Sequence, residues 1–121
     1  MADEISVTVA AAVAKGGASI ECESRTMTVD MSGVDMASFT QNVDTTNEAL
    51  AIPADIAAPC SLVIVNLDST NYVEIFNDSG NAELHDKLLP GEFCYINRWD
   101  LKGYARANTA ACQIQVWAWE A

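Results

Sequence analysis

The sequence predicts an all-β protein, built as an antiparallel β-sandwich or barrel of about eight short strands with little or no helix. Three observations favour this class. Short runs in which apolar and polar residues alternate recur along the chain. Clusters of Gly, Pro, Asn and Asp separate these runs, and no stretch shows the apolar spacing of an amphipathic helix.

The first third of the chain contains three alternating runs. Residues 5–9, 20–23 and 26–31 place apolar side chains at every second position, which predicts half-buried strands. Lys15-Gly16-Gly17 predicts a turn between the first two runs, and Ser32-Gly33 ends the third.

The middle of the chain, residues 34–60, is less regular. Pro53 and Pro59 exclude a long central strand, because proline has no N–H to donate to a sheet ladder. We therefore expect only short strands here, over residues 39–43 and 49–52.

The second half contains the clearest strand signals. Leu89-Pro90-Gly91-Glu92 fits a type II turn, in which proline fixes one φ angle and glycine supplies a positive one. The predicted strands in this half cover residues 62–65, 72–76, 92–97, 104–107 and 112–119.

The alternation also predicts which side chains are buried. Within residues 92–97 the phase is open, because Phe93 and Tyr95 compete with Cys94 and Ile96 for the inside, and a shift of one residue inverts the face. The predicted core comprises Ile5, Val7, Val9, Ile20, Met27, Val29, Ile64, Val73, Ile75, Cys94, Ile96, Ile114 and Val116.

Length and charge narrow the class of protein. Residues 1–121 are expected to form a single β-sandwich domain. Seventeen acidic residues against six basic ones give a formal net charge of −11, which repels phosphate, so no direct nucleic-acid or membrane partner is expected. No run approaches the roughly 18 apolar residues of a membrane span. The acidic start, Met1–Glu4, differs from a basic signal peptide, so synthesis in a cytoplasm is expected.

The four cysteines, Cys22, Cys60, Cys94 and Cys112, form no C-x-x-C unit that could begin a zinc site. Two disulfides are compatible with an even count, but a cytoplasmic origin argues against them. We expect four small, unpaired core residues.

The segment 66–80, NLDSTNYVEIFNDSG, is rich in Asn and Asp on both sides of a predicted strand. Its oxygens could bind Ca²⁺, although the spacing does not fit an EF-hand loop. Asn and Asp also hydrogen-bond their own backbone in tight turns, which is the favoured interpretation. No metal and no cofactor are expected.

Catalytic motifs do not stand out. His85 is the only histidine, whereas a cupin-type metal site needs two or three, and no serine lies in a G-x-S-x-G elbow. Phosphate-binding glycine motifs are absent from the sequence. Paired carboxylates of a glycosidase type stay open on composition alone. The prediction is a non-enzymatic protein with no catalytic residue.

The order of the motifs AKGG, VDMSG, TTNEAL, NLDSTNYVEI, LLPGEF and YARANTAACQIQV resembles that of small virion structural proteins of tailed bacteriophages, over residues 14–116. The resemblance implies a jelly-roll-like β-sandwich with a structural role on the head or tail. The first expectation is an outer capsid decoration or cement protein that stabilises the head. Its partners would be the major capsid protein and neighbouring copies of itself, a trimer being one arrangement. The excess of acid suits the outer surface of the virion, away from packaged DNA.

An alternative is a recognition module on the tail or head that binds a host carbohydrate or protein. Sugar sites usually contain exposed aromatic side chains beside polar ones. Trp99, between Arg98 and Asp100, is the best candidate for such a contact.

The last predicted strand departs from the virion group because it ends in two tryptophans. Cys112, Ile114, Val116 and Ala118 share its apolar face, and Gln113, Gln115, Trp117 and Trp119 share the other. Two indoles on a face that begins polar predict either a partner interface or cover by another segment of the domain. The candidate partner interface comprises Trp117, Trp119, Gln113, Gln115 and Trp99.

Overall fold

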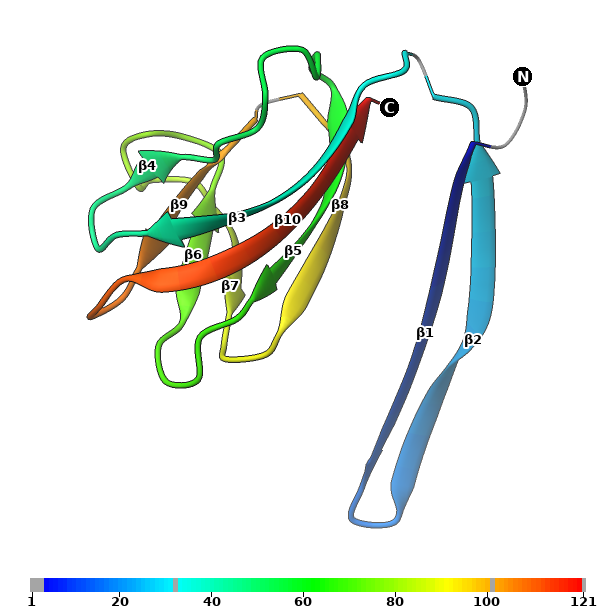
Figure 1. Ribbon diagram of the computed structural model, residues 1–121. Coiled ribbons are helices and arrows are strands. Elements are labelled where there is room, and N and C mark those ends of the chain that lie inside the picture. The colour runs from blue at the N-terminus through cyan, green and yellow to red at the C-terminus, as the bar shows by residue number, and fades with distance from the viewer. Residues whose placement is uncertain (1–3, 32, 101, 121) are drawn as a thin grey trace. The chain divides into compact units, whose positions relative to one another are not determined.

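The computed structural model describes residues 4–31, 33–100 and 102–120 (Figure 1). Its regular secondary structure, within these residues, consists of strands alone, and the predicted all-β class is confirmed. The strands are β1 (Ile5–Lys15), β2 (Ala18–Val29), β3 (Met36–Val43), β4 (Glu48–Ala49), β5 (Cys60–Asn66), β6 (Val73–Phe76), β7 (Leu84–Leu88), β8 (Phe93–Trp99), β9 (Tyr104–Ala107) and β10 (Cys112–Glu120).

The chain divides into two compact units, Met1–Ser32 and Gly33–Ala121. In its described residues, 4–31, the first contains the hairpin of β1 and β2 as its only regular structure, and the second contains both four-stranded sheets. The sequence analysis expected one sandwich over residues 1–121, because alternation with a period of two indicates a strand without indicating which sheet it joins. The sandwich strands all lie between Met36 and Glu120.

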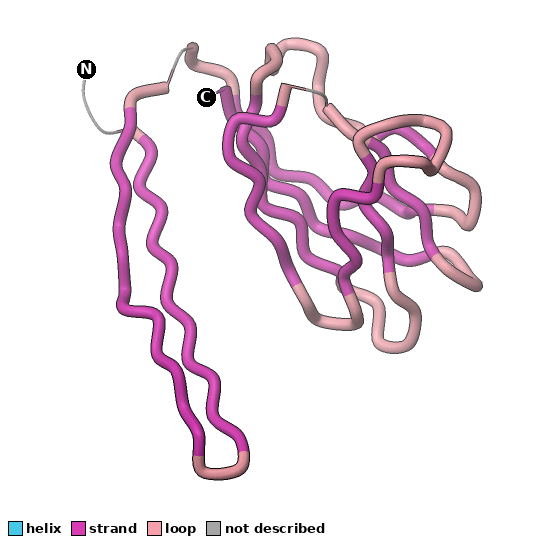
Figure 2. The backbone as a smooth tube through the Cα atoms, turned by 180° about the vertical axis from the view of Figure 1, so that it is seen from behind, coloured by secondary structure: helices cyan, strands magenta, loops and turns pink. Residues whose placement is uncertain are grey.

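The second unit is a two-layered arrangement of antiparallel sheets (Figures 1 and 2). One sheet has the strand order β3-β10-β5-β8 and the other β4-β9-β6-β7. Most consecutive strands therefore lie in different sheets, which is compatible with a jelly-roll-like topology. That finer assignment stays a prediction.

The two sheets share one hydrophobic core. Ile64, Ile114 and Val116 come from the first sheet, Val73 and Ile75 from the second, and all five are fully buried. These predictions are confirmed, and β8 resolves the open phase, because Cys94 and Ile96 point inward. Phe93 on the same strand is 70% exposed.

Three local features differ from or refine the sequence-based elements. The strand β7 was not predicted, because its consecutive polar residues 85–87 break the alternation. The predicted strand at 49–52 is only the short β4. The type II turn is confirmed: Gly91 has a φ of 80°, and the Glu92 N–H donates to the Leu89 carbonyl at 2.9 Å.

The first unit is a long antiparallel hairpin whose turn lies at Gly16 and Gly17, as predicted, with φ values of 60° and 86°. The two runs predicted at 20–23 and 26–31 belong to the single strand β2. A register shift lies opposite the segment Val9–Ala11 and separates the runs, which explains why the alternation is interrupted there.

The hairpin residues were predicted to belong to a core, and this prediction is largely wrong. Val9 is 51% exposed and Ile20 is 75% exposed. Val7, Met27 and Val29 are partly exposed, and Ile5 is buried; Cys22, predicted as a core thiol, is also exposed. The physical reason is that a two-stranded ribbon offers no second layer of its own to cover an apolar face. None of the described residues forms a helix long and apolar enough to cross a membrane.

Candidate interaction surface

The outward side of the β3-β10-β5-β8 sheet carries aromatic and uncharged polar side chains. The register places Trp117 of β10 directly opposite Ser38 of β3 and Val63 of β5, and Val63 opposite Tyr95 of β8. A row of side chains therefore crosses all four strands. We call this side the uncharged face and define it by Met36, Ser38, Thr40, Asn42, Val63, Val65, Phe93, Tyr95, Asn97, Gln113, Gln115, Trp117 and Trp119.

The uncharged face is exposed where its largest apolar side chains lie. Phe93 is 70% exposed, Met36 68% and Trp117 42%. Charged residues make up 19% of the chain, yet none stands at any of the positions that define this face. Depletion of charge together with exposed aromatic and Met side chains is the composition of the centre of a protein–protein interface.

The β10 residues predicted as an interface lie together on this face. Trp117 is exposed, and Gln115 donates from Nε2 to the Ser38 hydroxyl at 3.1 Å. Trp119 is half-buried and stacks on Tyr95, with ring centroids 6.2 Å apart and an interplanar angle of 17°. Gln113 is exposed. The buried Nε1 of Trp119 has no hydrogen-bond partner among the described residues.

Trp99 does not join this face, so its proposed role as an exposed aromatic platform is contradicted. It is only 7% exposed, and its Nε1 donates to Asn77 Oδ1 at 2.8 Å. The cause is a bulge in β8, where Arg98 has a φ of 53°. The extra residue inverts the alternation, so Trp99 points inward opposite Cys60.

The other outer face, over β6, β7 and β9, has a different chemistry. Arg106 and Glu74 form an ion pair at 2.8 Å, and Glu74 lies opposite Lys87. The Lys87 ammonium lies 4.0 Å from the centroid of the Tyr72 ring. Charged side chains are usually exposed to solvent. This outer face therefore favours contact with water, whereas the uncharged face favours contact with a protein partner.

The Asn- and Asp-rich segment has the turn chemistry that the sequence favoured. Buried Asn66 donates to the carbonyls of Asn71 and Leu88 at 2.9 and 3.0 Å. Asp68 accepts the backbone N–H groups of Asn71 and Thr70, and these hydrogen bonds lower its pKa. These side-chain oxygens already satisfy the backbone of the loop.

A second turn in the same segment uses Asp78. Its carboxylate accepts the N–H groups of Glu83, Ala82 and Gly80, and its pKa lies below the usual value mainly because of the bond from Glu83. The described residues contain no group of three or more His, Cys, Asp or Glu side chains arranged to hold a metal ion. The calcium alternative therefore has no geometric support in the part of the chain that the structure describes.

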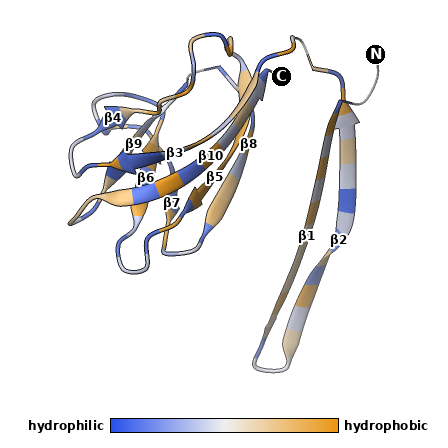
Figure 3. Cartoon of the chain, viewed as in Figure 1, coloured by the Kyte–Doolittle hydropathy of each residue, from blue (hydrophilic) through white to orange (hydrophobic). Residues whose placement is uncertain are grey.

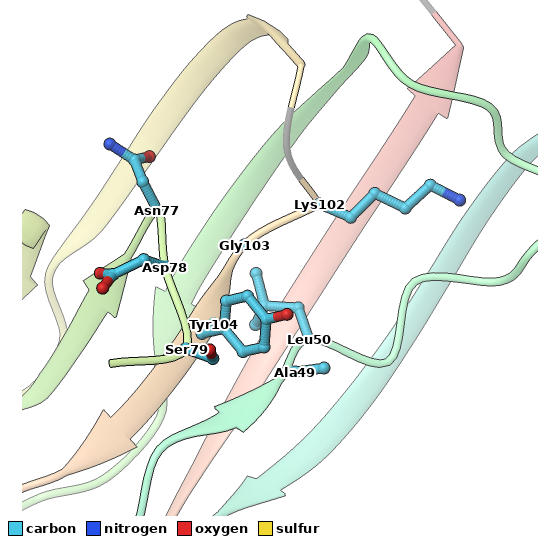
Figure 4. Close-up of a pocket in the computed structure, with 8 residues that line it drawn as sticks. All are labelled: Ala49, Leu50, Asn77, Asp78, Ser79, Lys102, Gly103 and Tyr104. Atoms are coloured by element: carbon cyan, nitrogen blue, oxygen red, sulfur yellow. The ribbon is translucent and has the colours of Figure 1, made fainter. Parts of the chain in front are cut away.

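A cavity of about 510 Å³ lies between the 77–79 turn, Leu50 and the start of β9 (Figure 4). Both charged groups of its lining are engaged elsewhere. Asp78 closes its own turn, and Lys102 extends away from Asp78 to the Pro53 carbonyl at 3.4 Å. Its lining holds no histidine or cysteine that could serve as a base or nucleophile beside Ser79.

The buried thiols are also unsuited to chemistry. Burial, and to a lesser extent the neighbouring Asp86 carboxylate, raises the pKa of Cys94 to about 12. Burial raises the pKa of Cys60 and Cys112 as well. A thiol that stays protonated is a poor nucleophile and a poor metal ligand.

The sequence missed most of the uncharged face. It identified the β10 residues but not Phe93, Tyr95 or Met36, whose neighbours are known only once the strand order is known. The available signal was the phase of residues 92–97, since placing Cys94 and Ile96 inside necessarily places Phe93 and Tyr95 outside. No protein-family model, no curated protein and no solved structure matches this chain.

Proposed function

We propose that this chain is a non-enzymatic structural protein of a tailed-phage virion, an outer capsid decoration or cement protein. Its uncharged face would bind neighbouring copies and the major capsid protein. The virion assignment comes from the resemblance of the motif order, and the binding role comes from the surface. One observation supports the binding role. The sandwich has an uncharged aromatic face on one side, and on the other a charged face where Arg106 and Glu74 form an ion pair.

The energetics favour an interface on that side. Trp, Tyr, Phe and Met side chains bury large apolar areas and carry much of the binding free energy at protein contacts. A net charge of −11 gives copies of the chain a long-range repulsion, which is smallest where two uncharged surfaces meet. The acidic remainder of the surface suits exposure on the outside of a particle rather than contact with packaged DNA.

The recognition-module alternative loses its best residue, since Trp99 is buried against Asn77 and His85. Its ring centroid lies 5.3 Å from that of His85, so His85 already occupies part of the surroundings of the indole.

Copy number in purified particles tests the virion role. Particles from a culture that produces the protein would be banded on a density gradient, and the protein would be quantified by mass spectrometry against the most abundant shell protein. A head decoration role predicts hundreds of copies per particle. A few copies would place the protein in the tail, and none in the particle band would refute the virion role.

A matched pair of substitutions tests the binding face. Phe93→Ser removes an exposed aromatic side chain from the uncharged face, and Leu84→Ser removes an aliphatic side chain that is 51% exposed on β7 of the other sheet. We expect Phe93→Ser to lower the number of copies retained by the particles and Leu84→Ser to leave it unchanged. Equal retention of both variants would show that the face is not the attachment surface.

A further inference from the structure

The hairpin of β1 and β2 has one apolar face that its own unit does not cover. The register pairs Val7 with Met27, Val9 with Arg25 and Val13 with Ile20, so these side chains lie on one side of the ribbon. The opposite side carries Thr8 paired with Thr26. Val13 is 64% exposed and Ile20 75% exposed, and Figure 3 colours most of β1 as hydrophobic.

A two-stranded ribbon of this kind is marginally stable in water by itself and needs a surface to pack on. At about 3.3 Å per residue, the 11 residues of β1 extend over about 36 Å. The six residues between Val29 and Met36 allow a reach of at most about 24 Å between the hairpin and the sandwich. The hairpin therefore has the dimensions of an arm that reaches a neighbouring molecule.

We infer that the apolar side of residues 5–29 packs on the uncharged face of a second copy of this chain, and that the two copies exchange arms reciprocally. This inference rests on the proposed function, and it identifies the arm as the segment that covers the uncharged face when copies associate.

The arm could pack either on the uncharged face or on the arm of a second copy, and charge favours the uncharged face. Arg25 lies in the middle of the arm's apolar side, opposite Val9, and no carboxylate stands on that side. Packing two arms against each other would bury both guanidinium groups without a partner, which is costly. The uncharged face instead offers the aromatic rings of Trp117 and Tyr95, on which a guanidinium can stack.

Area favours the reciprocal arrangement over a single contact. An arm two strands wide, about 10 Å, that overlaps about 30 Å of the face has a footprint of roughly 300 Å². One arm on one face then buries about 600 Å² in total, the size of a weak contact, whereas two reciprocal arms bury about 1,200 Å², within the range of specific interfaces.

Cys22 provides a built-in probe, because it lies on the apolar side of the arm opposite Ala11 and is exposed, whereas the other three cysteines are buried. Two forms of the full chain would be co-expressed: one natural, the other carrying Cys22→Ser with Ser38→Cys on the uncharged face. A flexible bis-maleimide then joins the two forms only if the arm of one copy reaches the face of another. The control form carries Cys22→Ser with Lys87→Cys on the charged face.

We expect covalent pairs between the natural and the Ser38→Cys form and none with the Lys87→Cys form. Pairs between two natural chains through Cys22 would show that arms pack on arms. Equal yields with both engineered forms would show unspecific contact. A third form keeps Cys22 and carries Ser38→Cys. A cross-link within this single chain, without pairs between chains, would show that the arm covers its own sandwich. Each of these three results overturns the inference.

Two double variants test the apolar side itself. Val13→Lys with Ile20→Lys places two ammonium groups on the apolar side of the hairpin. Ala14→Lys with Ser19→Lys changes the adjacent residue pair and places the two ammonium groups on the opposite side. We expect the first pair to weaken self-association by at least about tenfold, because an unpaired ammonium is costly to bury, and the second to have little effect. Equal effects overturn the inference. If copies associate through the uncharged face but the arm forms no cross-links to it, the inference that the arm binds this face is wrong, and the proposed function stands. A natural chain that neither self-associates nor binds particles would contradict the proposed function as well.

Discussion

Replacement of Gly103 by alanine should damage the sandwich far more than the same replacement at Gly91. Both glycines have positive φ angles, 64° and 80°, so alanine is strained at either position. A Cβ at Gly103 would overlap the indole of Trp99, whereas a Cβ at Gly91 would meet nothing within 4 Å. The pair therefore separates backbone strain from displacement of the buried indole.

The magnitude follows from the burial of Trp99, which is 7% exposed and donates to Asn77 at 2.8 Å. A left-handed conformation costs alanine about 1–2 kcal/mol at either site. A tryptophan buries roughly 200 Å², which is worth about 5 kcal/mol. Losing half of that burial and one hydrogen bond costs about 3 kcal/mol more. We expect Gly91→Ala to lose about 1–2 kcal/mol and Gly103→Ala about 4–5 kcal/mol.

Urea unfolding followed by tryptophan fluorescence measures both values. With an m-value of roughly 1.5–2 kcal/mol/M for a chain of this size, the two midpoints should differ by about 1.5–2 M. The native fluorescence of Gly103→Ala should also shift, because the indole moves toward water. Equal midpoints with unchanged spectra would refute the placement of Trp99 over Gly103.

Three further outcomes are expected. Ile114→Ala should lose roughly 2–5 kcal/mol in urea unfolding, because Ile114 is fully buried, whereas Ile20→Ala should lose less than about 0.5 kcal/mol in the dissociated chain; similar losses would contradict the assignment of the two sites. Asp78→Asn should destabilise the chain near neutral pH but not in acid. The pKa of Asp78 is lower in the folded chain than in the unfolded chain. The Asp78 carboxylate therefore stabilises the fold above the unfolded pKa, and this stabilisation is lost as the pH falls through the folded pKa. A difference in unfolding free energy between the natural chain and Asp78→Asn that does not depend on pH would count against this. Alkylation without reductant should modify Cys22 alone in the folded, dissociated chain and four thiols in denaturant, as read by mass spectrometry; a protected Cys22 in the dissociated chain, or fewer than four sites in denaturant, would contradict it.

The strand pattern could be predicted from local sequence because alternation and turn chemistry are local properties. The turn at 89–92 and the core positions of β5, β6 and β10 follow directly from residue type and spacing. The same alternation in residues 5–29 could not distinguish a sandwich strand from a ribbon, since partner strands are set by contacts far apart in the sequence. The exposure of Ile20 and Cys22 therefore became visible only in the structure.

The candidate surface was predictable only in part. The two faces of β10 were read correctly, because a strand with a uniformly apolar face and a mixed one has a defined phase. Trp99 was misplaced because one inserted residue in β8 inverts the side chain's direction, and the sequence around Arg98 gives no signal for a left-handed residue there. Met36 and Phe93 join the face only through the strand order β3-β10-β5-β8.

The most direct test of the central claim is the solution mass of the full chain and of two charged variants by sedimentation equilibrium. Phe93→Lys places an ammonium group on the uncharged face, and Leu84→Lys makes the same change in charge at an exposed position on the other sheet. The account predicts that the natural chain and Leu84→Lys self-associate and that Phe93→Lys is monomeric. A monomeric natural chain, or self-association that Phe93→Lys leaves unchanged, would contradict it.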